Sequence, residues 1–168
     1  MGIFDALNAP GVRSGTAYFA EGKFLARLQS MSYKLSQDPK RPENTVVVIA
    51  NFAIVESTRP DTEPGEVRGI VKVLEPPKRG AFGPDWSDVK ALLLALTGCN
   101  PADMAAVSKA EAEITAKGGS VASLLEAACS EGNPLAGTQI RITATDKPTK
   151  SGGTFTTFVF APYVKGAE

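Results

Sequence analysis

The sequence predicts a mostly β protein with a helical insertion, and three observations support this fold class. Apolar and polar residues alternate in several segments before residue 75 and again after residue 138, as they do in half-buried strands. Between these segments, residues 85–133 carry apolar side chains at helical spacing. The 168 residues, 43% of them hydrophobic, are enough for a single domain with one packed core, which we expect to span residues 1–168.

The first strand is expected at residues 22–35, GKFLARLQSMSYKL, after an irregular N-terminal arm at residues 1–21. Its apolar residues alternate with charged or polar ones as far as Ser30. From Met31 onward, the apolar residues occupy the other parity. A β-bulge at this point would account for the change of phase.

Two further strands follow, each after a loop that contains two prolines. The segment TVVVIANFAIVES is apolar on both parities and rich in β-branched residues, which predicts an interior strand covered on both faces. In EVRGIVKVLE, three valines occupy one parity and two cations, Arg68 and Lys72, occupy the other. We expect these two cations to point outward from the sheet.

Three helices are predicted in the insertion. Ser87 can cap the first one, whose apolar residues follow the i, i+3, i+4, i+7 pattern up to Gly98. The second helix is expected to begin at Asn100 or Pro101. The third is expected to begin at Ser120, which is a good capping residue.

Two alternating segments after residue 138 predict a closing hairpin with a Gly-Gly pair in its turn. Arg141 lies on the polar parity of the first of these strands. In the second strand, Phe158 and Phe160 share one parity and are expected in the core. Phe155 lies on the other parity, next to the turn, and is expected to be exposed.

Three strands, a helical connection and a terminal hairpin follow one another in the order found in the OB-fold, a five-stranded Greek-key barrel. We therefore expect an OB-fold-like barrel with its helices between the third and fourth strands. Two other arrangements fit the same order of elements. One is a small β-sandwich with an inserted helical lobe, and the other is an α+β sheet covered on one face.

Several functional classes are disfavoured by what the sequence lacks. It contains no histidine and neither GxGxxG nor GxxxxGK[ST], so we expect no catalytic residue, no metal ligand and no cofactor. Cys99 and Cys129 are expected to be buried thiols, with a disulfide as the alternative. The sequence shows no apolar run long enough to span a membrane and no signal-peptide pattern, so we expect a cytoplasmic location.

Charge is distributed unevenly, although the net charge is zero. Residues 81–136 hold three Lys/Arg and seven Asp/Glu, and the segments on either side are positive. Cations on the polar parity of several strands would converge on one outward face and could follow a phosphate backbone. These cations are Lys23, Arg27, Arg68, Lys72 and Arg141. The alternative is an ordinary solvated sheet face.

Aromatic residues near strand ends and loops also lie beside positive charge, where bases of a single strand could stack on them. The candidates in this group are Tyr33, Lys34, Lys78, Arg79, Phe82, Trp86, Lys147, Lys150 and Phe155. The alternative for the aromatic members, and above all for Trp86, is that they close the ends of the hydrophobic core.

The pattern over residues 20–163 resembles the single-stranded DNA-binding proteins encoded by bacterial viruses, a divergent OB-fold group. The resemblance rests on GKFLARL, NTVVVIANFAIVES, PGEVRGIVKVLE, FGPDWSDVKALLLALTG and KSGGTFTTFVFAPY. It implies binding of single-stranded DNA without sequence preference during replication and recombination, in the host cytoplasm. Members of this family often recruit partner enzymes through an acidic C-terminal tail, whereas this sequence ends in VKGAE with one acidic residue.

We therefore expect a non-catalytic protein that binds and protects single-stranded DNA, as a monomer or a homodimer. The main alternative is a structural or interaction protein, such as a virion component, that binds no nucleic acid. A second alternative is a small carboxylate-dependent nuclease that uses Asp85 or Asp88.

Overall fold

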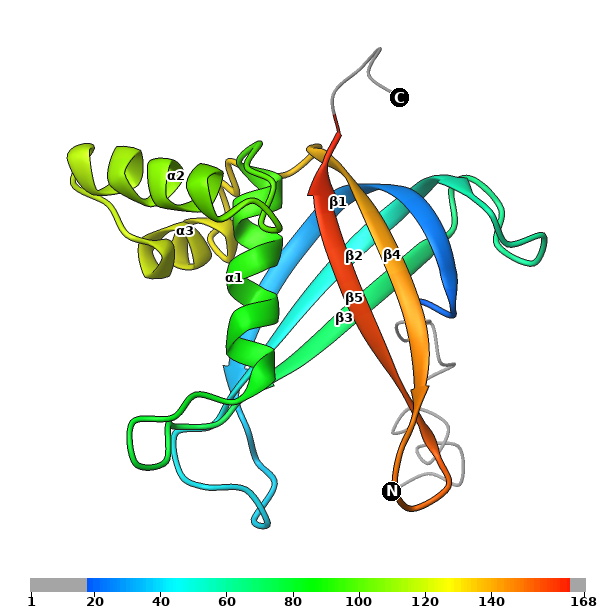
Figure 1. Ribbon diagram of the computed structural model, residues 1–168, viewed down its shortest axis with the longest axis horizontal. Helices are drawn as coiled ribbons and strands as arrows, with labels where there is room; N and C mark the ends of the chain where they lie inside the picture. The colour runs from blue at the N-terminus through cyan, green and yellow to red at the C-terminus, as the bar shows by residue number, and fades with distance from the viewer. Residues whose placement is uncertain (1–17, 164–168) are drawn as a thin grey trace, which may run out of the picture.

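The computed structural model describes residues 18–163, which form five strands and three helices (Figure 1). The mostly β composition and the position of the helices between the third and fourth strands are as the sequence predicts. The elements are β1 (Gly22–Leu35), β2 (Val46–Ser57), β3 (Val67–Leu74), α1 (Pro84–Leu96), α2 (Met104–Ala116), α3 (Val121–Ala128), β4 (Gln139–Pro148) and β5 (Thr154–Pro162).

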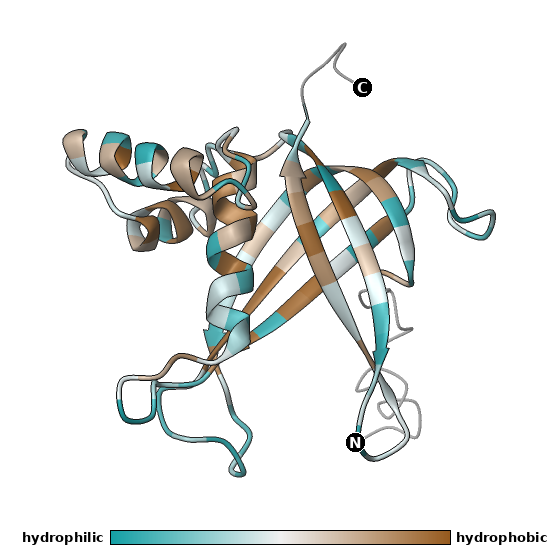
Figure 2. Ribbon diagram, viewed as in Figure 1, coloured by the Kyte–Doolittle hydropathy of each residue, from teal (hydrophilic) through white to brown (hydrophobic). Residues whose placement is uncertain are grey.

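All five strands pair in antiparallel fashion in one sheet with the order β3-β2-β1-β4-β5. The sheet is open within residues 18–163, because the two edge strands, β3 and β5, do not pair with each other. The outward and inward faces follow the two-residue period of each strand, and Figure 2 shows the resulting alternation of hydrophobic and hydrophilic residues.

Helix α1 packs against both edge strands, β3 and β5, on the side where the sheet is open. Its N-terminal part is tied to β3 by polar contacts of Asp85 and Asp88. Asp85 Oδ2 accepts a hydrogen bond from the backbone N–H of Val73 at 2.8 Å, and Lys72 Nζ lies 2.7 Å from Asp88 Oδ2. The helix therefore occupies the position where a fully closed barrel would have β3–β5 pairing.

The end of the N-terminal arm also contributes to the core. Tyr18 forms a parallel bridge with Gly69 of β3, and Phe19 is only 3% exposed. The Phe19 ring packs edge-to-face on Phe24 of β1, with the ring centroids 4.9 Å apart, and also contacts the rings of β2 and β5. Residues 18–19 are thus part of the packed structure rather than an irregular arm, and the rest of that predicted arm lies outside the described residues.

Two hydrophobic clusters hold the elements together. The larger one lies between the inward face of the sheet and α1, and includes Phe52 and Phe160, which are 0% and 2% exposed. The smaller one joins α2 to the end of α1 through Leu94, Cys99 and Val107. Both cysteines are free thiols, as the sequence predicts, but only Cys99 is buried and Cys129 is partly exposed. Figure 1 shows α2 and α3 as a lobe beside α1.

The predicted bulge in β1 is confirmed. Leu28 pairs with Phe52 and Ser30 pairs with Asn51, so one extra residue of β1 lies between these pairs. Leu28 and Met31 both point into the core as a result. The extra residue moves the following part of β1 by one parity and brings Lys34 to the outward face, opposite Val47.

The predicted orientation of β3 is wrong. Arg68 and Lys72 share their parity with Ile70 and Leu74, which are buried, so these two cations lie on the inward side of the strand. The three valines of β3 face outward instead. The reason is that α1 packs beside β3 and places carboxylates next to Lys72, which stabilises a cation on a face that periodicity alone assigns to solvent.

Candidate nucleic-acid interface

Three of the predicted cations converge on the outward face of β1 and β4. Lys23 lies opposite Thr143, Arg27 lies opposite Gln139, and Arg141 lies opposite Leu25. Successive outward residues on paired strands are near neighbours, so these charges form one group. All three side chains are exposed, and none takes part in an ion pair with another residue of the described chain.

Lys34 extends this group along β1. Its pairing with Val47 places it on the same outward face, and Ser30 and Ser32 lie between it and Arg27. At about 3.3 Å per residue, Lys34 is roughly 35 Å from Lys23 along the strand. We name the four exposed cations Lys23, Arg27, Lys34 and Arg141 the basic face.

A shallow cleft of about 270 Å³ lies on the basic face. Lys23, Arg141 and Glu56 are among the residues that line it, and Leu25 forms an apolar floor that is 5% exposed. The Arg141 guanidinium also lies over the Tyr163 ring, 5.2 Å from its centroid. Cations therefore surround a small apolar surface, with one carboxylate at its edge.

The β4–β5 hairpin continues the outward face and carries an exposed ring. Phe155 is 49% exposed and lies opposite Lys147, while Lys150 is exposed in the turn. On the inward face, Phe158 stacks on Phe160 with the ring centroids 5.9 Å apart. The predicted division of the three phenylalanines between core and surface is confirmed.

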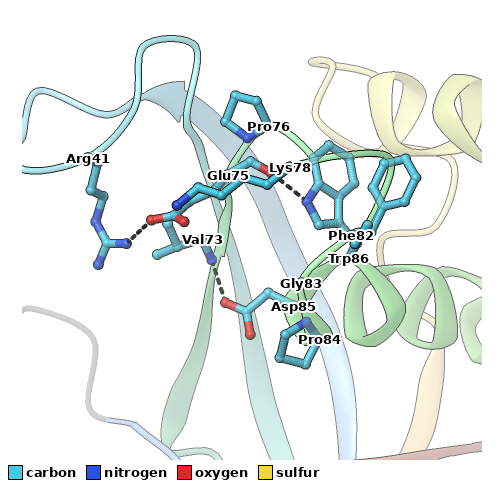
Figure 3. A pocket seen from close by; sticks show the side chains of 11 residues that line it. Arg41, Val73, Glu75, Pro76, Lys78, Phe82, Gly83, Pro84, Asp85 and Trp86 are labelled. Carbon is cyan, nitrogen blue, oxygen red and sulfur yellow. Dashed lines mark hydrogen bonds and ion pairs between the residues drawn. The ribbon is translucent and has the colours of Figure 1, made fainter.

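A second group of predicted residues lies near the end of β3, around a cleft of about 550 Å³ that we name the Trp86 cleft (Figure 3). Lys78, Phe82 and Trp86 line it, and Arg79 is an exposed neighbour. Phe82 is 62% exposed and packs edge-to-face on Trp86, with the ring centroids 5.3 Å apart. Trp86 is partly buried and packs against the core as well, so it caps the core and also lines this cleft.

Three predicted residues lie neither on the outward face of the sheet nor at the Trp86 cleft. Lys72 is 9% exposed and lies close to Asp88 and Asp85, at 2.7 and 3.7 Å. The Arg68 side chain is 17% exposed and pairs with Glu66 at 2.9 Å. Tyr33 is exposed, but it is on the inward parity, because it pairs with the buried Val48.

Sequence reasoning missed two members of the surface. Tyr163 was not included, although it lies two residues after Ala161, which faces Arg141 across β4 and β5. Alternation along the last strand was the signal that could have identified it. Arg41 lines the Trp86 cleft through its pairing with Glu75, which joins two loops that are distant in sequence and gave no local signal.

Asp85 and Asp88, the two carboxylates considered for catalysis, both contact other residues of the protein. No group of three or more His, Cys, Asp or Glu side chains that could hold a metal is found among residues 18–163. Asp85 accepts a hydrogen bond from Val73, and Asp88 pairs with Lys72. Both carboxylates therefore fasten α1 to the sheet.

None of the helices in the described range is long and apolar enough to cross a membrane. The chain matches no protein-family model, no curated protein and no solved structure. Function must therefore be argued from the geometry of the surface.

Proposed function

We propose that the protein binds single-stranded DNA without sequence preference. The observation that carries this proposal is the basic face, where four exposed cations lie on one side of the sheet and make no ion pairs within residues 18–163. Cations that follow a strand and have no carboxylate partner are free to contact phosphates and release counterions.

The aromatic residues favour a single strand over a duplex. Phe155 presents about half of its surface beside Lys147, and an unpaired base can stack on such a ring, whereas the bases of a duplex are already stacked on each other. No helix among the described elements carries a row of exposed cations that would enter a major groove.

We further assign the fold to the OB type. The order β3-β2-β1-β4-β5 is the neighbour order of an OB barrel that is open between β3 and β5, and OB barrels are commonly partly open. OB-folds bind oligonucleotides on an outward strand surface and its adjoining loops, which agrees with the location of the basic face. This assignment supports the resemblance to the viral single-stranded DNA-binding proteins.

One observation favours the alternative of an interaction protein. The outward faces of β2 and β3 are largely apolar and only partly covered, and the residues concerned include Val47, Ile49, Val67, Val71 and Val73. Such a surface would suit contact with another protein chain, including a second copy of this one. Large assemblies in light scattering, combined with no affinity for DNA, would favour this alternative.

The first test is a titration of fluorescently labelled oligo-dT, read by anisotropy, with duplex DNA and RNA of equal length as competitors. We expect a Kd on the order of micromolar or lower at low salt, and a loss of affinity as salt rises, by about 0.7 log units per tenfold salt for each phosphate contact. No binding at low salt would contradict the proposed function.

The second test replaces two cations of the basic face, in the double variant Arg27→Glu/Arg141→Glu. We expect at least about a tenfold loss of affinity and a shallower salt dependence, because two phosphate contacts become repulsive. The matched control is Lys109→Glu/Lys117→Glu, which changes the net charge equally at the α2 lobe. An equal loss in both variants would show that only the total charge matters and would argue against a defined site.

A further inference from the structure

The Trp86 cleft is a concave surface lined by two aromatic side chains, Phe82 and Trp86. It lies between the end of β3, the loop that follows and the first turn of α1, and the loop between β1 and β2 contributes Arg41 (Figure 3). Its walls combine apolar and charged residues, so the chemistry of a ligand depends on which polar groups are already engaged.

Most polar groups of the cleft have partners within the protein. Glu75 Oε1 accepts from Arg41 Nη1 at 3.2 Å, and the backbone oxygen of Glu75 accepts from Trp86 Nε1 at 2.8 Å. Asp85 accepts from the backbone N–H of Val73 at 2.8 Å. These contacts fix the orientation of the indole ring and engage one oxygen of each carboxylate.

The surface that is left for a ligand is mainly apolar. It consists of the side chains of Val73, Pro76, Phe82, Pro84 and Trp86. Phe82 is unusually exposed for a phenylalanine, at 62%, and is held edge-on to Trp86. Lys78 lines the cleft and Arg79 is an exposed neighbour. A flat, uncharged ring with an anionic group beside it fits this arrangement.

The cleft lies near the Lys34 end of the basic face. Lys34 lies opposite Val47, and Val47 lies opposite Val73, so the three residues form one row across β1, β2 and β3 on the outward side. Adjacent strands are about 4.8 Å apart, which places Val73, a wall of the cleft, roughly 10 Å from Lys34. A DNA single strand that runs along β1 as far as Lys34 can therefore reach the cleft across a short apolar surface.

We propose that the Trp86 cleft is a base-binding subsite, in which one unstacked base of a bound single strand packs against Phe82 and Trp86 while its phosphates contact Lys34 and Lys78. This inference rests on the proposed function and adds a second contact region to the basic face. A DNA single strand bound in this way would turn across the sheet at Lys34 instead of continuing beyond the end of β1.

The test uses the fact that Trp86 is the only tryptophan in the chain, so tryptophan emission reports on the surroundings of this one side chain. Oligo-dT of increasing length is titrated into the full chain while Trp86 emission and the anisotropy of an end-labelled oligonucleotide are recorded. We expect emission to change only with oligonucleotides long enough to reach from the basic face to the cleft.

The variant Phe82→Ala should lower affinity for long oligonucleotides by roughly tenfold, since one stacked base is worth about 1–3 kcal/mol. It should have little effect on oligonucleotides too short to reach the cleft. Because the Phe82 side chain is mostly exposed, the melting temperature of the Phe82→Ala variant should equal that of the parent protein. The control Phe155→Ala should weaken binding but leave the change in Trp86 emission at saturation as in the parent protein.

The outcomes separate this inference from the proposed function. Anisotropy that shows binding, together with constant Trp86 emission and unchanged affinity of Phe82→Ala, would overturn the subsite and leave the function standing. No change in anisotropy would overturn the function itself. Emission that responds to a proline-rich peptide but not to oligo-dT would assign the cleft to a protein partner and would also overturn the subsite.

Discussion

Three phenylalanines in β5 show how odd or even position along a strand sets the role of a side chain. Phe158 and Phe160 point inward and stack on each other, whereas Phe155 faces outward beside Lys147. Parity alone predicted this division, because β5 has no bulge between Thr154 and Pro162 and its whole register with β4 is regular. In a strand without a bulge, alternation divides the residues correctly between two faces, but other residues of the pattern must indicate which face is inward.

The two faces of β5 should respond differently to truncation. Phe155→Ala should weaken oligo-dT binding by roughly tenfold, because it removes a stacking surface. Its free energy of unfolding in urea should change by less than about 0.5 kcal/mol, since surface substitutions are usually near neutral. Phe158→Ala should cost about 2–4 kcal/mol of unfolding free energy, because it leaves a cavity next to Phe160. Affinity lost only in Phe158→Ala would contradict the placement of the DNA on the outward face.

Lys72 shows where alternation fails. Its position relative to three valines suggested an outward cation, but the valines are on the outward face and the amine lies against α1 and 5.2 Å from the centroid of the Phe158 ring. The alternation in the sequence of β3 is compatible with either face of the strand pointing inward. What decides between them is the contact with a helix that is formed later in the chain, which no local pattern reveals.

Helix boundaries within the insertion were predicted with mixed success. The third helix begins where expected, with Ser120 as N-cap and a reciprocal hydrogen bond to Ser123. The first helix begins about one turn before the predicted Ser87, because Pro84 at its start has a backbone angle already suited to a helix. The second begins after the predicted position, with Asp103 as its N-cap. Several acceptable caps in one loop compete, and tertiary packing selects among them.

The attachment of α1 to β3 should depend on Asp88. Asp88→Ala leaves the largely buried amine of Lys72 with Asp85 as its nearest carboxylate, at 3.7 Å. We expect a loss of about 1–3 kcal/mol in the free energy of unfolding, because a desolvated charge loses its hydrogen-bond partner. The measurement is urea denaturation followed by circular dichroism.

A suitable control for Asp88→Ala is Glu111→Ala, which removes the exposed ion pair with Lys90. Pairs of this kind contribute about 0–1 kcal/mol, so the control should be clearly more stable than Asp88→Ala. Equal stability of the two variants would show that the Lys72 contact does not fasten the helix to the sheet.

At the scale of the whole molecule, packing is concentrated in one cluster, and a much smaller cluster holds α2. The order of strands and helices along the chain and the site of the helical insertion followed from the sequence, because they depend on local periodicity. The opening between β3 and β5 did not, because it results from the volume that α1 and Phe19 occupy beside the sheet. Two of the five expected strand cations, Arg68 and Lys72, are absent from the basic face because they lie on the inward parity of β3.

Because α2 is held by the smaller cluster, we expect α2 to unfold locally more easily than the sheet. Cys99 lies in the small cluster, and burial raises the pKa of its thiol, as do the charges of Asp103 and Glu111. At a given pH near neutrality, fewer Cys99 thiolates are therefore present than in the unfolded chain, and reaction with a thiol reagent should require opening of α2.

In a Cys129→Ser background, Val107→Ala should accelerate labelling of Cys99 several-fold, because it removes part of the small cluster and costs about 1 kcal/mol locally. Oligo-dT affinity should stay unchanged. Met104→Ala, at a position of α2 that is 72% exposed, is the control and should not alter the labelling rate. Labelling that follows the urea midpoint of the whole protein in every variant would show instead that α2 unfolds only with the sheet.

The strand order also has a consequence for how the chain folds during synthesis. The meander β1-β2-β3 is complete once Leu74 has been made, but the second edge of β1 stays without its partner until β4 appears. At roughly 5–20 residues per second, a ribosome reaches the end of β5 at Pro162 several seconds after Leu74. An exposed strand edge can pair with other chains in that interval, so the nascent protein is most prone to aggregation before its terminal hairpin emerges.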